Sequence, residues 1–175
     1  MKREINIFEN AKKIFDLFPS PGILVTTKSG DQVDAMTIGW GSIGMEWSVP
    51  IFTAYIRDSR FTHELLEKNP EFTVCVPLDA ADPKIKKALA ICGSRSGRDV
   101  DKFELAGLTR VDSEVVKSPA IQEFPLTIEC RVAYKKLQEV SEIDKTLASF
   151  YPATGNHSAP HVAYYGEILK SYIIE

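Results

Sequence analysis

The segment "ICGSRSGRDVDKF", residues 91–103, holds the residues whose types and spacing could do chemistry. Five residues separate Cys92 from Arg98, and two glycines and two serines lie among them. A cysteine-dependent phosphatase uses this spacing, with a thiolate nucleophile at the base of a loop that binds phosphate. The same loop could instead hold the phosphate of a bound cofactor and do no covalent chemistry.

The setting of Cys92 argues against the phosphatase. That chemistry needs the cysteine at the end of a buried strand, whereas the preceding residues "KIKKALAI" show a helical pattern. Arg95 stands where a phosphatase loop carries glycine, and Asp99 stands where it carries a hydroxyl. Because a carboxylate at Asp99 would repel a substrate phosphate, we interpret the spacing as a coincidence.

A second cationic junction lies in "AYIRDSRFTHELL", where a predicted strand runs directly into a predicted helix. A helix N-terminus attracts anions, and this one is surrounded by Arg57, Ser59, Arg60 and Thr62. The loop at residues 94–98 adds further donors, and Lys102 follows it. The alternative is that Ser59 only caps the helix while the charged residues lie on the surface. Two such junctions in a net-acidic chain favour a dedicated phosphate ligand.

Composition excludes several classes of partner. The chain has 175 residues, a formal net charge of -3 and 44% hydrophobic residues, which is ordinary for a soluble protein and argues against nucleic acid or a membrane surface as the main partner. We find no run long enough to span a bilayer and no secretory signal, and we expect a cytoplasmic location. Three widely spaced cysteines indicate no disulfide framework, and the spacing of His157 and His161 across prolines predicts no zinc site.

Hydrophobic periodicity predicts one mainly antiparallel domain over residues 1–175. Helices are expected at 6–18, 59–69 and 82–92, the second capped by Asp58 or Ser59, with another turn or two in 98–108. Strands are expected at 22–28, 32–40, 50–58, 71–77, 125–140 and 161–174. Because these strands need partners for their edges, we expect them to close into a barrel.

Five segments together resemble the flavin reductase-like family, specifically its flavoredoxin type. They are "DAMTIGWGSIGMEWSVP", "YIRDSRFTHELLEKNPEFTV", "CGSRSGRDVDKFELAGLT", "LTIECRVAYKKL" and "HVAYYGEI". They occur in family order from about Met36 to Ile168. One departure is Asp34, where family members often carry asparagine.

The resemblance implies a mainly β fold with short helices, a split β-barrel of Greek-key topology that binds FMN and forms a homodimer. Met36, Thr37 and Trp40 would line one side of the flavin. The resemblance assigns the phosphate and ribityl chain to Arg57, Ser59, Arg60 and Thr62. It also implies that Ser94, Arg95, Ser96 and Gly97 close over the cofactor, that Lys102 adds positive charge, and that His161 lies near the exposed flavin face. A histidine there, with a pKa near neutral, could donate a proton.

The leading functional hypothesis is an oxidoreductase that passes electrons through FMN from NAD(P)H or a redox partner to an acceptor. The sequence lacks a glycine-rich dinucleotide fingerprint, so a nicotinamide would bind transiently against the flavin. The alternative from another class is a non-enzymatic flavin carrier or sensor. The choice between NADH and NADPH stays open at this stage.

Overall fold

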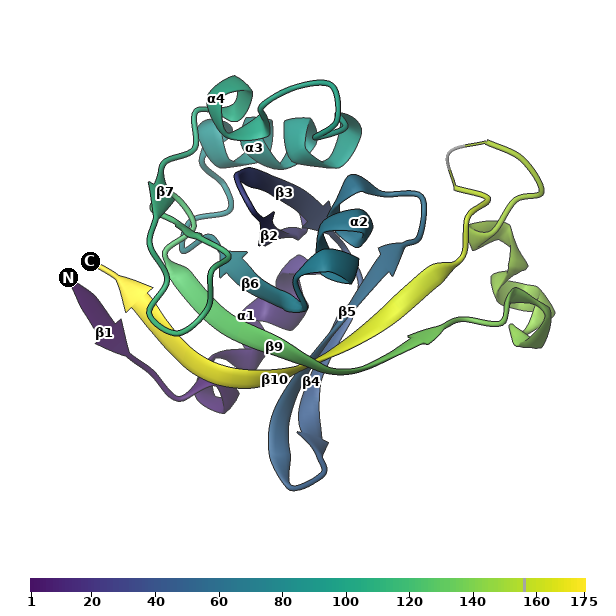
Figure 1. Ribbon diagram of the computed structural model, residues 1–175, viewed down its shortest axis with the longest axis horizontal. Coiled ribbons are helices and arrows are strands. Elements are labelled where there is room, and N and C mark those ends of the chain that lie inside the picture. The colour runs from purple at the N-terminus through teal and green to yellow at the C-terminus, as the bar shows by residue number, and fades with distance from the viewer. Residues whose placement is uncertain (156) are drawn as a thin grey trace.

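The computed structural model describes residues 1–155 and 157–175 and is built around one strongly curved antiparallel sheet (Figure 1). The strands of this sheet follow the order β3-β2-β6-β9-β10-β5-β4, and β1 pairs with β10. The strands are β1 (Lys2–Glu4), β2 (Ile23–Ser29), β3 (Gln32–Ile38), β4 (Gly41–Glu46), β5 (Val49–Arg57), β6 (Glu71–Val76), β9 (Leu126–Leu137) and β10 (His161–Ile174). A small second sheet pairs β7 (Arg110–Val111) with β8 (Ala120–Ile121).

The hydrogen-bonded ladder does not close on itself among the described residues. Its path ends at β3 on one side and at β4 on the other, although these two strands follow each other along the chain. The expectation of closure was therefore too strong, and the barrel is split. The mainly β fold with short helices is confirmed.

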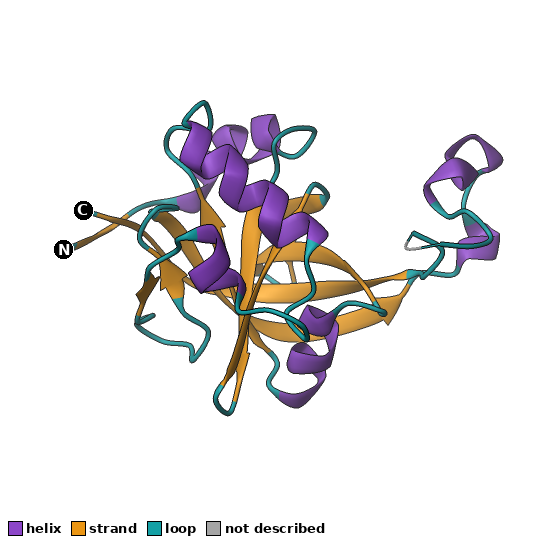
Figure 2. Ribbon diagram, turned by 90° about the horizontal axis from the view of Figure 1, so that it is seen from above, coloured by secondary structure: helices purple, strands orange, loops and turns teal. Residues whose placement is uncertain are grey.

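Four α-helices accompany the sheet in the described chain: α1 (Ile7–Leu17), α2 (Phe61–Lys68), α3 (Pro83–Ser94) and α4 (Lys102–Ala106). Figure 2 shows them packed around the orange sheet. Helices α2, α3 and α4 all contact β3, so they cover the edge strand. Asp82 caps α3 through its side chain, and Gly107 ends α4 with a φ of 68°, as an aspartate–proline start and a glycine stop favour.

The inner face of the sheet forms the main core, with Phe52, Phe72 and Tyr164 fully buried. A second cluster lies between the sheet and α3, around Leu24, Leu89 and Cys92. The alternating pattern of the strands places these side chains inward, as burial of apolar area requires. The two clusters hold β3 and α3 in register, and the candidate site lies between these elements.

The β9–β10 loop, described over residues 138–155 and 157–160, projects from the body where the two long strands end (Figures 1 and 2). It carries two short 3-10 helices, η1 (Val140–Glu142) and η2 (Lys145–Phe150). Neither was expected from the sequence. The β4–β5 hairpin projects from another side of the sheet and was also missed.

Candidate functional site

A pocket of about 300 Å³ lies where β3, the start of α2, the end of α3 and the start of β10 meet. Its lining includes twelve of the thirteen residues that the sequence singled out: Met36, Thr37, Trp40, Arg57, Ser59, Arg60, Thr62, Arg95, Ser96, Gly97, Lys102 and His161. These residues come from five separate stretches of the chain. The structure therefore brings both cationic junctions into one cavity.

Ser94 is the exception. It ends α3, is exposed, and its Oγ donates a hydrogen bond to the carbonyl of Ala90 at 2.7 Å. It is not part of the pocket lining. The structure therefore does not bring Ser94 into the pocket with the others, because the helix extends through this residue and its hydroxyl bonds back to the preceding turn.

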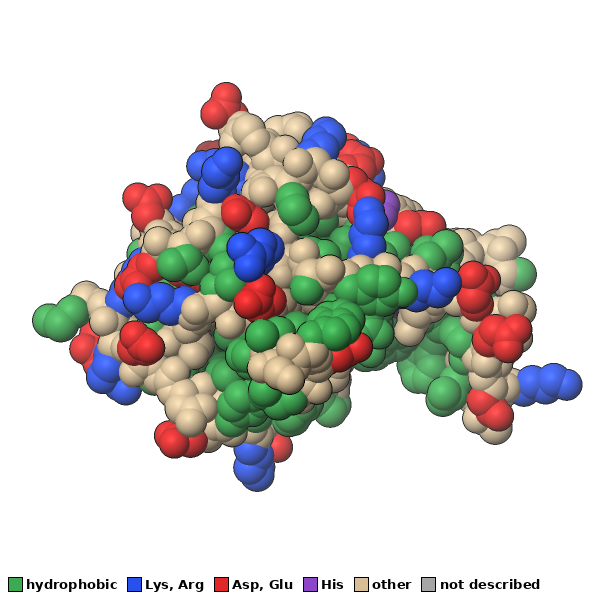
Figure 3. All heavy atoms as spheres, turned by 60° about the horizontal axis from the view of Figure 1, so that its bottom comes forward, with side chains coloured by type: hydrophobic (Ala, Val, Ile, Leu, Met, Phe, Trp, Pro, Cys, Tyr) green, Lys and Arg blue, Asp and Glu red, His purple; other side chains and the backbone are tan. Residues whose placement is uncertain are grey.

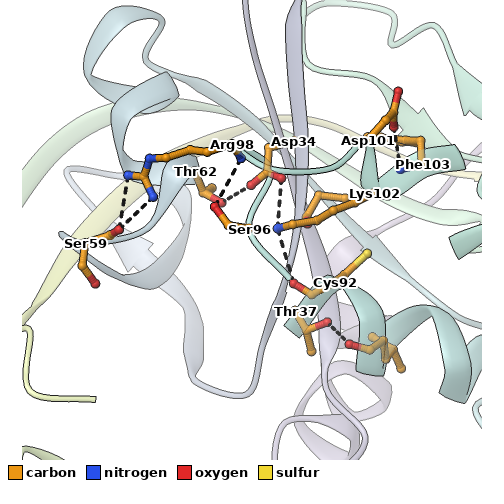
Figure 4. Close-up of polar contacts among 12 residues, drawn as sticks. Asp34, Thr37, Ser59, Thr62, Cys92, Ser96, Arg98, Asp101, Lys102 and Phe103 are labelled. Carbon is orange, nitrogen blue, oxygen red and sulfur yellow. Dashed lines mark hydrogen bonds and ion pairs between the residues drawn. The ribbon is translucent and has the colours of Figure 1, made fainter. Parts of the chain in front are cut away.

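The N-terminus of α2 opens into the pocket. Its N-cap is Arg60, which makes no side-chain capping bond within the described chain, so the expected caps Asp58 and Ser59 were wrong. The first N–H groups of the helix thus lack a side-chain acceptor, which is the arrangement that attracts an anion. The guanidinium of Arg98 lies beside this end, where it donates to the carbonyl of Ser59 (Figure 4). It also pairs with Glu64.

Positive charge dominates this cavity. The described lining contains Arg57, Arg60, Arg95, Arg98 and Lys102 against one carboxylate, that of Asp34. A partly enclosed site with this excess favours a phosphate or another anion, because guanidinium groups form charge-assisted hydrogen bonds with its oxygens.

A buried ion pair forms the floor of the pocket. Lys102 Nζ lies 3.0 Å from Asp34 Oδ1, and the two residues are 5% and 1% exposed. Lys102 also donates to the carbonyl of Ala35 at 2.9 Å, while Thr62 donates to Asp34 Oδ2 at 2.7 Å. Figure 4 shows this network joining β3, α2 and α4. The charge of Lys102, which was expected to add positive charge at the cofactor, is therefore paired with that of Asp34.

Cys92 also lies at the floor of the pocket, but its surroundings suit a packing role and not a nucleophilic one. It is 1% exposed, and burial raises the pKa of its thiol to about 12. A thiol with this pKa is protonated at neutral pH and is a poor nucleophile. The geometry therefore supports the rejection of the phosphatase reading.

Arg57 is placed at the pocket but is engaged with the protein itself. Its Nη1 donates to the carbonyls of His157 at 2.6 Å and Ala159 at 2.5 Å, and its Nη2 donates to that of Phe150 at 3.0 Å. Burial lowers the pKa of the guanidinium, and the nearby Arg60 lowers it further. Arg57 thus anchors the β9–β10 loop, a role that the sequence analysis did not foresee.

His161 lines the same pocket beside Trp40, with their ring centroids 4.7 Å apart, and pairs with Arg57 in the β10–β5 ladder. Its exposure is 7%, and burial followed by the charges of Arg57 and Arg60 lowers its pKa to about 4. The expected pKa near neutral was therefore wrong. At neutral pH His161 carries no proton that it could donate from an imidazolium.

Trp40 is half-exposed and packs edge-on against Phe150 of the β9–β10 loop. It extends from the short link between β3 and β4, so it stands at the pocket rim and not in the sheet core. Met36 and Thr37 lie behind it on β3, where the Thr37 hydroxyl donates to the Leu89 carbonyl of α3 at 2.6 Å. The pocket therefore combines cationic side chains with aromatic and apolar ones.

Within residues 1–155 and 157–175, no group of three histidine, cysteine, aspartate or glutamate side chains is placed to hold a metal ion. In the same part of the chain, no helix is long and apolar enough to cross a membrane.

Comparison with known proteins identifies the family. The model of the flavin reductase like domain matches residues 15–172. The chain belongs to this family. An uncharacterized protein of Archaeoglobus fulgidus is 34% identical over 117 residues, which cover 67% of this chain and 61% of that protein. The chain thus spans about six-tenths of the length of this relative.

Solved structures of flavin reductase-like proteins share the fold. A flavoredoxin from Methanosarcina acetivorans is 25% identical, with a TM-score of 0.65 over 89% of this chain and 69% of that one. An FMN-binding domain of a flavin reductases-like enzyme from Shewanella baltica is 16% identical, with a TM-score of 0.66 over 99% of this chain and 77% of that one. The resemblance to the flavoredoxin type is confirmed, and family membership supports flavin binding.

Sequence reasoning missed several groups in this flavin reductase-like pocket. Asp34 was noted only as a departure, and its pairing with Lys102 joins residues 68 positions apart, which no local pattern reveals. Tyr55 and Phe61 also line the pocket. Tyr151 contacts His161 directly, and Gln138 is linked to it through Tyr151. Both lie in a loop whose sequence has no hydrophobic periodicity.

Proposed function

We propose that this protein is an FMN-dependent oxidoreductase that takes hydride from NAD(P)H, or electrons from a redox partner, and passes them through FMN to an acceptor. The observation that carries the proposal is that one pocket combines five cationic side chains with aromatic and apolar ones. FMN has matching features, because it carries a phosphate and a flat ring. When bound, FMN supplies the hydride and one-electron chemistry.

The phosphate would bind at the start of α2. Arg60 caps this helix without a side-chain bond in the described chain, and Ser59 precedes it. Arg95 and Ser96 approach from the loop that follows α3. A monophosphate fits this arrangement, since the uncapped N–H groups and the guanidinium groups together can donate to several oxygens. The flavin reductases-like protein of Shewanella baltica is described as FMN-binding, which supports the choice of nucleotide.

The flavin ring would lie beside the aromatic and apolar side chains of the lining. Met36, Thr37 and Trp40 provide its wall, and His161 stands next to Trp40. Lys102 also lines the pocket, but its charge is balanced by Asp34. Arg57 contributes by holding the β9–β10 loop against the pocket rim. We further propose that the chain works as one domain, as a homodimer, in the cytoplasm.

Reconstitution with FMN tests the proposal. The purified chain should take up FMN and turn yellow, and denaturation should release FMN. Anaerobic mixing with NADH or NADPH should then bleach the flavin absorbance. A chain that takes up no FMN would contradict the proposal. Uptake without bleaching by either nucleotide, but with reduction by a partner protein, would assign it to the electron carriers.

A matched pair of arginine variants locates the phosphate. Arg60→Ala removes a charge from the pocket, whereas Arg131→Ala removes one from the outer surface of β9, where Arg131 pairs with Glu167. A charge-assisted hydrogen bond contributes roughly 1.5–3 kcal/mol, so Arg60→Ala should weaken FMN about tenfold to a hundredfold. Arg131→Ala should leave affinity unchanged. If both variants bound FMN with equal affinity, the phosphate would have to bind away from the start of α2.

A further inference from the structure

A chain of hydrogen bonds leads from the pocket into the β9–β10 loop. The Tyr151 hydroxyl lies 2.7 Å from His161 Nδ1 and 2.8 Å from Gln138 Oε1. A tyrosine hydroxyl has one proton, and the amide oxygen of Gln138 can only accept. Tyr151 therefore donates to Gln138. His161 Nδ1 must then carry the proton that it shares with the Tyr151 oxygen.

Tyr151 is held in this orientation by its neighbours. The guanidinium of Arg57 lies 5.1 Å from the centre of its ring, which favours a cation–π contact. The same guanidinium donates to the carbonyl of Phe150, the residue before Tyr151, at 3.0 Å. Phe150 in turn packs against Trp40 at 5.3 Å between ring centroids. These contacts hold the ring of Tyr151 and the adjoining backbone, and the hydrogen bond to Gln138 orients its hydroxyl.

The charges around His161 keep its ring neutral. Arg57, Arg60 and His157 are the charged or titratable groups that oppose a second proton, and burial opposes it more strongly than they do. A neutral imidazole with its proton on Nδ1 has a lone pair on Nε2. His161 belongs to the pocket lining, and its Nδ1 is occupied by Tyr151. Nε2 is therefore the ring nitrogen left for a ligand.

We propose that Tyr151 and Gln138 are positioning residues that fix His161 as a hydrogen-bond acceptor, and that the pocket thereby selects a flat ring carrying an amide N–H or a hydroxyl. The aromatic face of such a ring fits beside Trp40, and its donor pairs with Nε2 of His161. An analogue that lacks the donor leaves Nε2 unpaired in a buried place, which is unfavourable. This selectivity rests on the proposed function, because the ring is that of the electron donor or acceptor.

The first test needs no flavin, so it is independent of the proposed function. Imidazole nitrogen NMR on the full chain reports the tautomer, and only His63, His157 and His161 contribute signals. His63→Gln and His157→Gln assign them. At pH 7 His161 should be neutral with its proton on Nδ1. A proton on Nε2, or a charged ring, would overturn the proposal.

Variants of the two partners test the positioning. Tyr151→Phe keeps the ring but removes the hydroxyl, so His161 should lose the fixed Nδ1–H tautomer. Gln138→Leu leaves Tyr151 free to donate to Nδ1, which should increase the population with the proton on Nε2. Tyr134→Phe, on the exposed part of β9, is the control and should change nothing. An unchanged His161 tautomer in both partner variants would assign Tyr151 a packing role only.

The last test addresses the ligand class in the FMN-loaded protein, with benzamide and methyl benzoate as probes. Both are flat rings of similar size, but only benzamide has an N–H donor. Benzamide should bind roughly fivefold more tightly, the effect of one neutral hydrogen bond, and should shift the Nε2 signal of His161. Tyr151→Phe should abolish the preference. Equal binding of both probes to the wild type would overturn the selectivity.

Discussion

At the scale of single residues, the Asp34–Lys102 pair places two charges where water hardly reaches. Removing one partner of such a pair costs about 3–5 kcal/mol, because the other charge stays buried and unpaired. Lys102→Met should therefore lower the free energy of unfolding by this amount. The double variant Asp34→Asn with Lys102→Met leaves no charge behind, and the oxygen of the introduced amide can still accept from Thr62. It should be clearly more stable than Lys102→Met alone, as measured by urea unfolding.

A surface ion pair in the same protein is the control for the Asp34 and Lys102 variants. Arg131 and Glu167 lie 2.8 Å apart, but Arg131 is largely exposed. Exposed pairs contribute about 0–1 kcal/mol, so Arg131→Met should have little effect. Additive effects of the Asp34 and Lys102 changes would show that the two side chains are not coupled.

His161 links stability to pH. Its pKa falls from an ordinary value of 6.5 in the unfolded chain to about 4 in the folded one. The unfolded state therefore binds more protons between these values, and the folded protein loses stability as pH falls from 6.5 through 4. The contribution of His161 to the free energy of unfolding approaches roughly 3 kcal/mol at neutral pH. Urea unfolding at pH 7.5, 5.5 and 4 should show this loss in the wild type and a smaller loss in His161→Gln. Parallel losses in both would contradict the lowered pKa.

The residue types in the sequence predicted which residues line the pocket better than they predicted the hydrogen bonds between them. Arginines, serines and a glycine at two junctions predicted an anion site, since each junction is local in sequence, and the structure places residues of both junctions in one pocket. The engagement of Arg57 with carbonyls 93–102 positions away depends on how the β9–β10 loop folds back. The pKa of His161 depends on burial and on arginines of other elements. Neither can be inferred from the neighbouring sequence.

At the scale of elements, Gly97 lets the loop between α3 and α4 approach the floor of the pocket. A Cβ on Gly97 would lie 2.3 Å from Asp34 Oδ1 and 2.8 Å from Phe61 Cδ1, which is too close. Gly97→Ala should push the loop outward and separate Arg95 and Ser96 from the start of α2. We expect FMN affinity to fall about tenfold, the loss of roughly one good hydrogen bond to a charged group.

Gly44→Ala is the matched control, because a Cβ at this position of β4 meets open space. It should bind FMN as the wild type does. Titration of the apoprotein with FMN compares the two variants, and thermal unfolding shows whether each is folded. A folded Gly97→Ala protein with unchanged affinity would mean that the loop takes no part in binding.

Elements with a strong sequence pattern were predicted well. Elements that form only because a neighbouring strand pairs with them were not. The alternation in β9 and β10 and the aspartate–proline start of α3 were read directly. Strand β4 contains two glycines and is mostly exposed, so its pattern is weak, and it forms because β5 pairs with it. Its turn, Trp47-Ser48, has φ of 51° and 62° at its two residues but lacks the asparagine and glycine that favour this turn.

At the scale of the whole molecule, two projections expose apolar side chains. The β4–β5 hairpin presents Met45 at 62% and Trp47 at 56% exposure. The arm formed by the end of β9 and the β9–β10 loop exposes Tyr134, Leu147 and Phe150. Figure 3, which brings the lower side of Figure 1 forward, shows hydrophobic side chains gathered on this side. Such concentrations of exposed apolar area are typical of interaction surfaces.

Trp47 connects the two projections and makes the proposed homodimer testable. It packs against Tyr134 and Tyr165 at 6.2 and 6.4 Å between ring centroids, yet it remains more than half exposed. A bulky residue at positive φ is strained by about 1–2 kcal/mol, and we propose that a second copy of the chain covers its exposed side. Light scattering should give twice the chain mass for the FMN-loaded wild type. Trp47→Asn, which suits the turn, should shift the protein toward monomer, whereas Leu105→Ser on the exposed side of α4 should not. A monomeric wild type with FMN bound would refute the dimer and would leave the apolar projections to another partner.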